Sequence, residues 1–189
     1  MKRIWPALKW CLVVWGAVSL VGVGIVGINI AQRFGAMDSI LGTSSEGSSA
    51  KVSKDDVRYV LNWCRLGDAR TEEVVHSYVS SQSFTGDHLD AHAIRISHVS
   101  IDELKQDDFG SGWYRCDQLK GVLADALDFV GGWSSRDDIK WFPTKEQLLT
   151  SDYYVYPWSI YCHGTRPTSA ELIFVRPSDR MVFYFGCKT

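Results

Sequence analysis

Charged side chains are missing from one long stretch of this chain. Residues 10–32 contain no lysine, arginine, aspartate or glutamate, and no acidic residue precedes Asp38. A helix over this stretch, rising about 1.5 Å per residue, reaches roughly 30 Å, which is the thickness of the hydrocarbon core of a bilayer. The sequence therefore predicts a transmembrane anchor at residues 10–32, preceded by a short tail at residues 1–9.

Basic residues flank the predicted anchor unevenly. Lys2, Arg3 and Lys9 precede it, whereas only Arg33 follows it closely. Positive residues near a span stay mainly on the cytoplasmic side, so we expect a cytoplasmic tail and an external remainder. In a bacterium this describes an inner-membrane protein with a periplasmic C-terminal domain. A cleaved signal peptide is the alternative, but its apolar region usually has about 7–15 residues, and this one is longer.

Small residues recur along one side of the predicted span. Gly27, Ala31 and Gly35 are four residues apart and share one helical face. Small side chains at this spacing allow two membrane helices to approach closely, so we expect helix–helix association there. The alternative is that glycine is simply common in membrane helices.

Closely spaced cysteines are also absent. Cys64, Cys116, Cys162 and Cys187 follow the anchor, and their wide spacing excludes a compact CxxC metal site. An even number of cysteines in an oxidising compartment predicts two disulfides, with three possible pairings. We favour Cys64–Cys116 and Cys162–Cys187, with free buried cysteines as the alternative.

Basic residues are in the minority after the anchor. Of the 20 lysines and arginines, the four named above belong to the anchor region, so 16 basic residues stand against 22 acidic ones in the rest of the chain. Nucleic-acid binding rewards clustered basic residues, so this composition argues against a nucleic-acid partner. It is compatible with a basic protein partner.

The part after the anchor divides into a linker and one domain. Residues 33–52 are rich in glycine and serine and are expected to be flexible, and residues 53–189 have the length of a single domain. Apolar spacing predicts helices over 53–66, 71–81, 114–130 and 144–149. Alternation predicts strands over 90–99 and 154–162, and a hairpin of 171–176 with 181–186. We therefore expect an α+β fold, with helices packed on one face of a C-terminal antiparallel sheet.

One segment offers candidate metal ligands. In an extended chain, His88, Asp90 and His92 would share one face, and two imidazoles with a carboxylate can hold zinc with an open position. Exposed polar residues at a strand entrance explain the same pattern. We therefore predict no bound metal or cofactor, and keep these three residues as a candidate set.

Aromatic residues are concentrated near the predicted strand 154–162. Alternation places Tyr154, Tyr156 and Trp158 on one face and Tyr153 on the other, with Trp141 nearby in the sequence. Exposed tyrosine and tryptophan are frequent anchors of protein interfaces, and they also stack on sugars. The alternative is that all of them fill the core.

No motif in the sequence specifies a reaction. Gly110-Ser111-Gly112 is not a nucleophile motif, and one ExxH at Glu73 to His76 cannot build a di-iron site. The sequence therefore predicts a single-pass, membrane-anchored extracytoplasmic module that binds a protein, as an accessory subunit of a bacterial envelope assembly. One alternative is an immunity-type inhibitor of a toxic enzyme. Another is a metal-dependent envelope hydrolase that uses His88, Asp90 and His92.

Overall fold

The computed structural model describes residues 52–81, 83, 86–107 and 110–189. The predicted tail, the predicted anchor, the Gly27/Ala31/Gly35 face and the linker up to residue 51 lie outside these residues, so those predictions stay predictions. Within the described part of the chain, none of the helices combines the length and the apolar character needed to span a bilayer.

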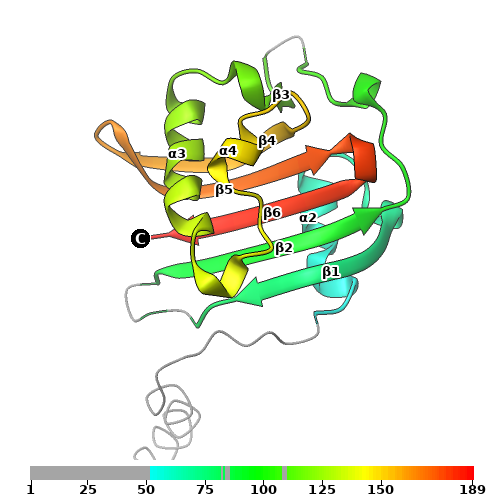
Figure 1. The fold of residues 1–189 in the computed structure, drawn as a ribbon, viewed down its shortest axis with the longest axis horizontal. Coiled ribbons are helices and arrows are strands. Elements are labelled where there is room, and N and C mark those ends of the chain that lie inside the picture. Colours follow the sequence, from blue (N-terminus) through cyan, green and yellow to red (C-terminus); the bar gives the residue numbers. More distant parts are fainter. Residues whose placement is uncertain (1–51, 82, 84–85, 108–109) are drawn as a thin grey trace, which may run out of the picture. The chain divides into compact units, whose positions relative to one another are not determined.

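A six-stranded antiparallel sheet forms the centre of the domain (Figure 1). Its strands lie in the order β1-β2-β6-β5-β4-β3, so β6, which follows the other five along the chain, is a central strand. The strands are β1 (Thr71–Val79), β2 (His88–Ile96), β3 (Tyr114–Arg115), β4 (Tyr154–His163), β5 (Arg166–Arg176) and β6 (Met181–Lys188). The α+β class is confirmed, and so is the C-terminal hairpin, which β5 and β6 form around Pro177–Asp179.

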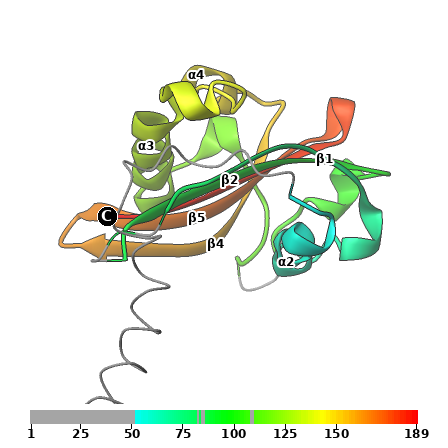
Figure 2. The ribbon, with the colours of Figure 1, turned by 90° about the horizontal axis from the view of Figure 1, so that it is seen from below.

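Helices lie on both faces of the sheet. Figure 2 shows α3 (Val122–Ser134) and α4 (Lys145–Leu148) on one side and α2 (Arg58–Trp63) on the other. We expected all helices on one face, but β6 is buried from Met181 through Cys187, so both of its faces need cover. The short 3-10 helices are Asp55–Val57, Asp68–Arg70, Ile101–Glu103, Cys116–Gln118, Asp137–Ile139 and Pro177–Asp179.

Each face of the sheet has its own apolar core. Under α3 and α4, the core includes Leu127, Phe142, Phe174, Phe183 and Phe185. Under α2, it includes Val57, Leu61, Ile94, Ile173 and Val182. Neighbouring residues of β5 and β6 therefore contribute to opposite cores, which is the alternation expected of a strand covered on both sides.

The prediction of a helix over 71–81 is wrong, because this segment is the edge strand β1. Register shifts occur between Thr71 and Glu73 and between Val74 and His76. Each shift adds a residue and interrupts the alternation of inward and outward side chains. Val74 and Val75 point to opposite faces, as adjacent strand residues do, and each packs against a core because both faces of the sheet are covered. Adjacent apolar residues of this kind imitate helical spacing in the sequence.

The long helix also differs from its predicted limits of 114–130. It begins at Val122, after Gly121, and continues through Gly131 and Gly132 to Ser134. Gly131 does not end the helix. A Cβ atom there would lie 2.9 Å from Cβ of Lys145, so the missing side chain lets α4 pack closely on α3. The short helix predicted at 144–149 is confirmed, with a capping box between Thr144 and Gln147.

Neither predicted disulfide is present, because Cys64, Cys116, Cys162 and Cys187 are all free. Cys64 belongs to the core under α2 and Cys116 to the core on the opposite face of the sheet. Cys162 is on β4 and Cys187 on β6, with β5 between them. Two strand spacings amount to roughly 9–10 Å, which exceeds the reach of a disulfide.

Candidate functional site

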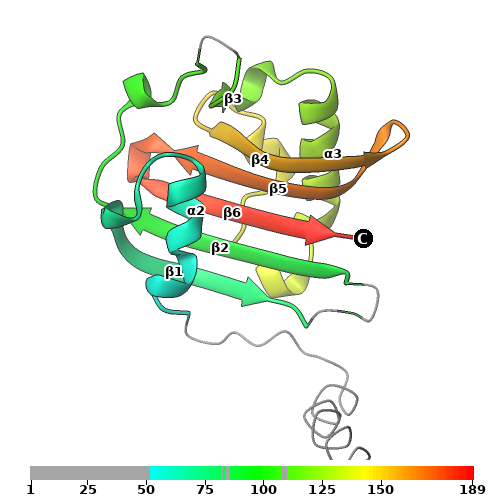
Figure 3. The same ribbon diagram turned by 180° about the vertical axis from the view of Figure 1, so that it is seen from behind.

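Part of the sheet face that carries α2 is left without a helix. Figure 3 shows α2 crossing the sheet near one end of the strands, while the end toward the C-terminus has no described helix on this side. The strand register identifies the residues of the uncovered part. One row across the sheet is Val79, Asp90, Gly186, Glu171 and Ser159, and the next is His88, Lys188, Ser169 and Tyr161.

Aromatic side chains border this uncovered part. Trp63 of α2 and Trp158 of β4 are stacked, with ring centroids 4.8 Å apart and an interplanar angle of 2°. Trp158 is nevertheless 44% exposed, and Tyr161 is 67% exposed. The register shifts between Pro157 and Ser159, so Trp158 is the extra residue of a bulge, and bulges often redirect a side chain toward a site.

Two acidic residues lie beside these aromatic rings. Asp90 on β2 and Glu171 on β5 both pair with Gly186 of β6, so they flank it in one row across the sheet. Both are partly buried. Burial raises the pKa of the Asp90 carboxyl, and it raises the pKa of Glu171 with a further increase from the charge of Asp90. We call Tyr59, Trp63, Asp90, Trp158, Tyr161, Glu171 and Tyr184 together the aromatic–acidic face.

Tyr184 fills the gap between the two acids. A Cβ atom at Gly186 would collide with the Tyr184 hydroxyl, so this phenol lies across Gly186 in the row that joins Asp90 to Glu171. The Tyr59 ring packs edge-on against it, with centroids 5.6 Å apart. Burial is the largest cause that raises the pKa of the Tyr184 hydroxyl, and nearby Tyr59, Glu171 and Asp90 add to it. Both phenols therefore stay neutral donors at physiological pH.

His92 is a buried part of the core in this structure. Its Nδ1 is 2.9 Å from the Ser77 hydroxyl and its Nε2 is 3.2 Å from the Tyr59 hydroxyl. Burial lowers the pKa of the imidazole to about 4, so the ring is neutral, donating to one hydroxyl and accepting from the other. With both ring nitrogens used, His92 has no free atom for a metal. Within the described residues, no group of His, Cys, Asp and Glu side chains has a geometry that could hold a metal ion.

The predicted aromatic residues divide between the two faces. Tyr154, Tyr156 and Trp158 share the α2 face, as alternation predicted, but Tyr156 is buried and only Trp158 of the three is exposed. Trp141 lies on the other side of the sheet, where it stacks on His76 at 5.2 Å. It therefore cannot contribute to one surface with Trp158.

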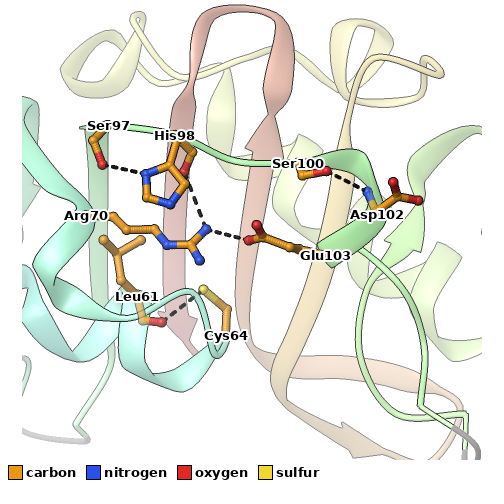
Figure 4. Close-up of polar contacts among 8 residues, drawn as sticks. All are labelled: Leu61, Cys64, Arg70, Ser97, His98, Ser100, Asp102 and Glu103. Carbon is orange, nitrogen blue, oxygen red and sulfur yellow. Dashed lines mark hydrogen bonds and ion pairs between the residues drawn. The ribbon is translucent and has the colours of Figure 1, made fainter.

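A second concave region lies beside the C-terminal end of α2, next to Cys64. Its volume is about 400 Å³, and its lining includes Cys64, Arg70, Glu103, Lys105 and Trp113. Figure 4 shows Arg70 pointing to Glu103, with which it forms an ion pair, and Cys64 donating to the Leu61 carbonyl. Burial raises the pKa of the Cys64 thiol to about 12, so it is not a thiolate nucleophile at neutral pH.

Reasoning from the sequence missed the pairing of Asp90 with Glu171. The sequence pattern marks Asp90 only as a candidate metal ligand, whereas its acidic neighbour across Gly186 is on β5, far away in the chain. One signal was available: Glu171 directly precedes the apolar run Leu172 to Val175, where a charge on a covered strand is unexpected. Trp63 was missed because it lies at the end of α2, outside the apolar stripe used to identify that helix.

The chain matches no protein-family model, no curated protein and no solved structure.

Proposed function

We propose that this protein is a single-pass, membrane-anchored extracytoplasmic module that binds another protein through the aromatic–acidic face. One observation carries the proposal: Trp158 is held by its stack on Trp63 and still exposes 44% of its surface on an uncovered part of the sheet. Tryptophan and tyrosine are the side chains that most often dominate binding energy at protein interfaces.

The stack also favours binding through its effect on entropy. A free tryptophan side chain loses rotamer freedom when a partner immobilises it, and this opposes association. Trp158 is already restrained by the parallel ring of Trp63, and Tyr59 packs against Trp63 in turn, at 4.5 Å between centroids. The face is therefore preorganised, and less of the binding free energy is lost in ordering it.

The sequence supports a location for this activity. The uncharged stretch 10–32 and the basic residues before it fit an inner-membrane anchor, with the domain in the periplasm. A linker over residues 33–52 would let the domain reach partners in the same envelope, and tethering raises their effective concentration. We propose an accessory subunit of a bacterial envelope assembly, in which Gly27, Ala31 and Gly35 contact a second membrane helix.

An immunity-type inhibitor is the second candidate. Two partly buried acids on the uncovered face would suit a protein that covers the basic active-site cleft of a toxic enzyme. The two candidates differ in what the membrane helix does. Replacing Gly27 and Ala31 by leucine should disrupt an assembly subunit, because bulky side chains prevent close helix approach, and should leave an inhibitor active.

The proposed binding surface is tested by Trp158→Ala in the full-length protein. We expect recovery of the partner, after crosslinking in cells and affinity purification, to fall at least about tenfold, as for an interface hot spot. Val122→Ala is the matched control, because Val122 is 52% exposed on α3, on the other face of the sheet. Equal recovery with both variants would show that Trp158 is not in the interface.

A further inference from the structure

Asp90 and Glu171 differ from the other acidic residues of the domain. Most described acids have a cationic or hydrogen-bonding partner, as when Glu73 pairs with Arg95 or Asp128 with Lys145. Asp125 and Asp152, which have neither kind of partner, are exposed. Among the described residues, Asp90 and Glu171 are the two acids that are partly buried yet have no hydrogen bond or ion pair.

Such an arrangement is unfavourable in the free protein. A carboxylate that loses water without gaining a partner is destabilised, and a second carboxylate nearby adds repulsion. The surrounding groups do not supply a cation in contact: Tyr59 and Tyr184 are neutral phenols, His92 is neutral, and Lys188 at the strand end is exposed. His88 on β2 lowers the pKa of both carboxyls slightly, against the larger effect of burial.

We propose that the partner of the aromatic–acidic face places an arginine side chain over the Tyr184 hydroxyl, where its guanidinium bonds to Asp90 and Glu171 and lies against the exposed ring of Trp158. This inference rests on the proposed function, because it names the chemistry of the partner at the same surface. It follows from charge complementarity on an uncovered sheet face, where two carboxylates lack a cation and an indole presents its π-system.

Arginine fits these groups better than lysine does. The guanidinium carries five donors in a planar fork and can bond to two carboxylates at once, whereas an ammonium is a compact point charge. It also stacks well on aromatic rings, and the attraction grows when the site excludes water. Because Asp90 and Glu171 are already partly dehydrated, binding has less of their hydration left to remove.

The probe for this inference is acetylated hexa-arginine amide, titrated calorimetrically into the full-length protein in a neutral detergent. We expect binding that weakens by about tenfold or more in the Asp90→Asn/Glu171→Gln double variant, since charge-assisted hydrogen bonds are lost. The control is Asp125→Asn/Asp152→Asn, which removes the same charge from exposed positions elsewhere. It should bind like the unaltered protein.

The outcomes separate this inference from the proposed function. If hexa-arginine does not bind, or if both double variants weaken it equally, the inference is overturned, because the attraction is then absent or only that of net charge. If Trp158→Ala loses the cellular partner while Asp90→Asn/Glu171→Gln keeps it, the protein-binding function stands and the arginine inference falls.

The melting temperature distinguishes carboxylates that wait for a partner from carboxylates that stabilise the fold, because the two cases predict changes of opposite sign. Folding raises the pKa of each carboxyl, so the charged carboxylates lower the stability of the folded protein at pH 7. This loss of stability is absent at pH values below the unfolded pKa, where the carboxyls are protonated in both the folded and the unfolded protein. The melting temperature of Asp90→Asn/Glu171→Gln should therefore rise at pH 7 and that of the control double variant should not. A fall would show that the carboxylates hold the fold together, and would overturn the inference.

Discussion

Replacing Phe142 by alanine is expected to lower the free energy of unfolding by about 3–5 kcal/mol. Phe142 is in the segment of the chain that connects α3 to α4, and only 2% of its surface is exposed. Its ring centroid is 6.2 Å from that of Phe174, 5.9 Å from Phe183 and 5.6 Å from Phe185, in edge-on contacts. These three partners belong to the rigid central strands β5 and β6, so they cannot move to fill the cavity, and the cost should be near the upper end.

The neighbouring residue provides a matched control. Trp141 is partly exposed, and its ring contacts His76 on the edge strand β1 and Phe142. Because part of the indole stays in solvent, Trp141→Ala should cost less than Phe142→Ala, about 1–3 kcal/mol. Denaturant unfolding of the full-length protein in detergent, followed by near-UV circular dichroism, measures both variants. Equal losses would contradict the assignment of Phe142 as the residue that joins the helices to the sheet.

The protein should lose about 3 kcal/mol of stability through His92 alone as the pH falls from about 6.5 to about 4. Burial lowers the pKa of this imidazole from 6.5 in the unfolded chain to about 4 in the folded protein. Between these values the unfolded chain binds a proton that the folded protein does not. The neutral ring thus contributes its full stability above the unfolded pKa, and this contribution disappears as the pH falls toward the folded one.

The comparison that isolates this effect uses His92→Gln. Glutamine does not titrate in this range and retains polar atoms that can bond to Ser77 and Tyr59, so its unfolding free energy should vary less with pH than that of the unaltered protein. Exposed His163 supplies the control, because His163→Gln should keep the full pH dependence. If His92→Gln and the unaltered protein have parallel stability profiles between pH 7 and 4, folding does not lower the pKa of the imidazole, and its burial is not as described.

Local signals in the sequence were sufficient for part of the fold. The hairpin of β5 and β6 follows from two apolar strands around Pro177 to Arg180, and the short helix predicted at 144–149 contains α4. These elements depend on neighbours in the chain, so a short window contains their cause. The order of the strands has no such local cause, because β2 pairs with β6 across about ninety residues of sequence, and no local pattern encodes that pairing.

The candidate site shows the same limit. Alternation correctly placed Trp158 on the face shared with Tyr154 and Tyr156. It could not show that Trp63 would stack on Trp158, or that Asp90 and Glu171 would meet on either side of Gly186. Each of these pairs joins elements that are distant in sequence. Trp141 was grouped with the wrong residues for the converse reason: it is near β4 in the chain but on the opposite side of the sheet.

The position of β6 also has a consequence for how the protein is made. The ribosome completes β1, β2, β4 and β5 before it reaches Met181–Lys188, yet β6 is the strand that joins the pair β1-β2 to the pair β4-β5. Until these residues emerge, neither core has its central strand, and the sheet remains in two separate halves. Both cores can therefore fold only after this segment has been synthesised.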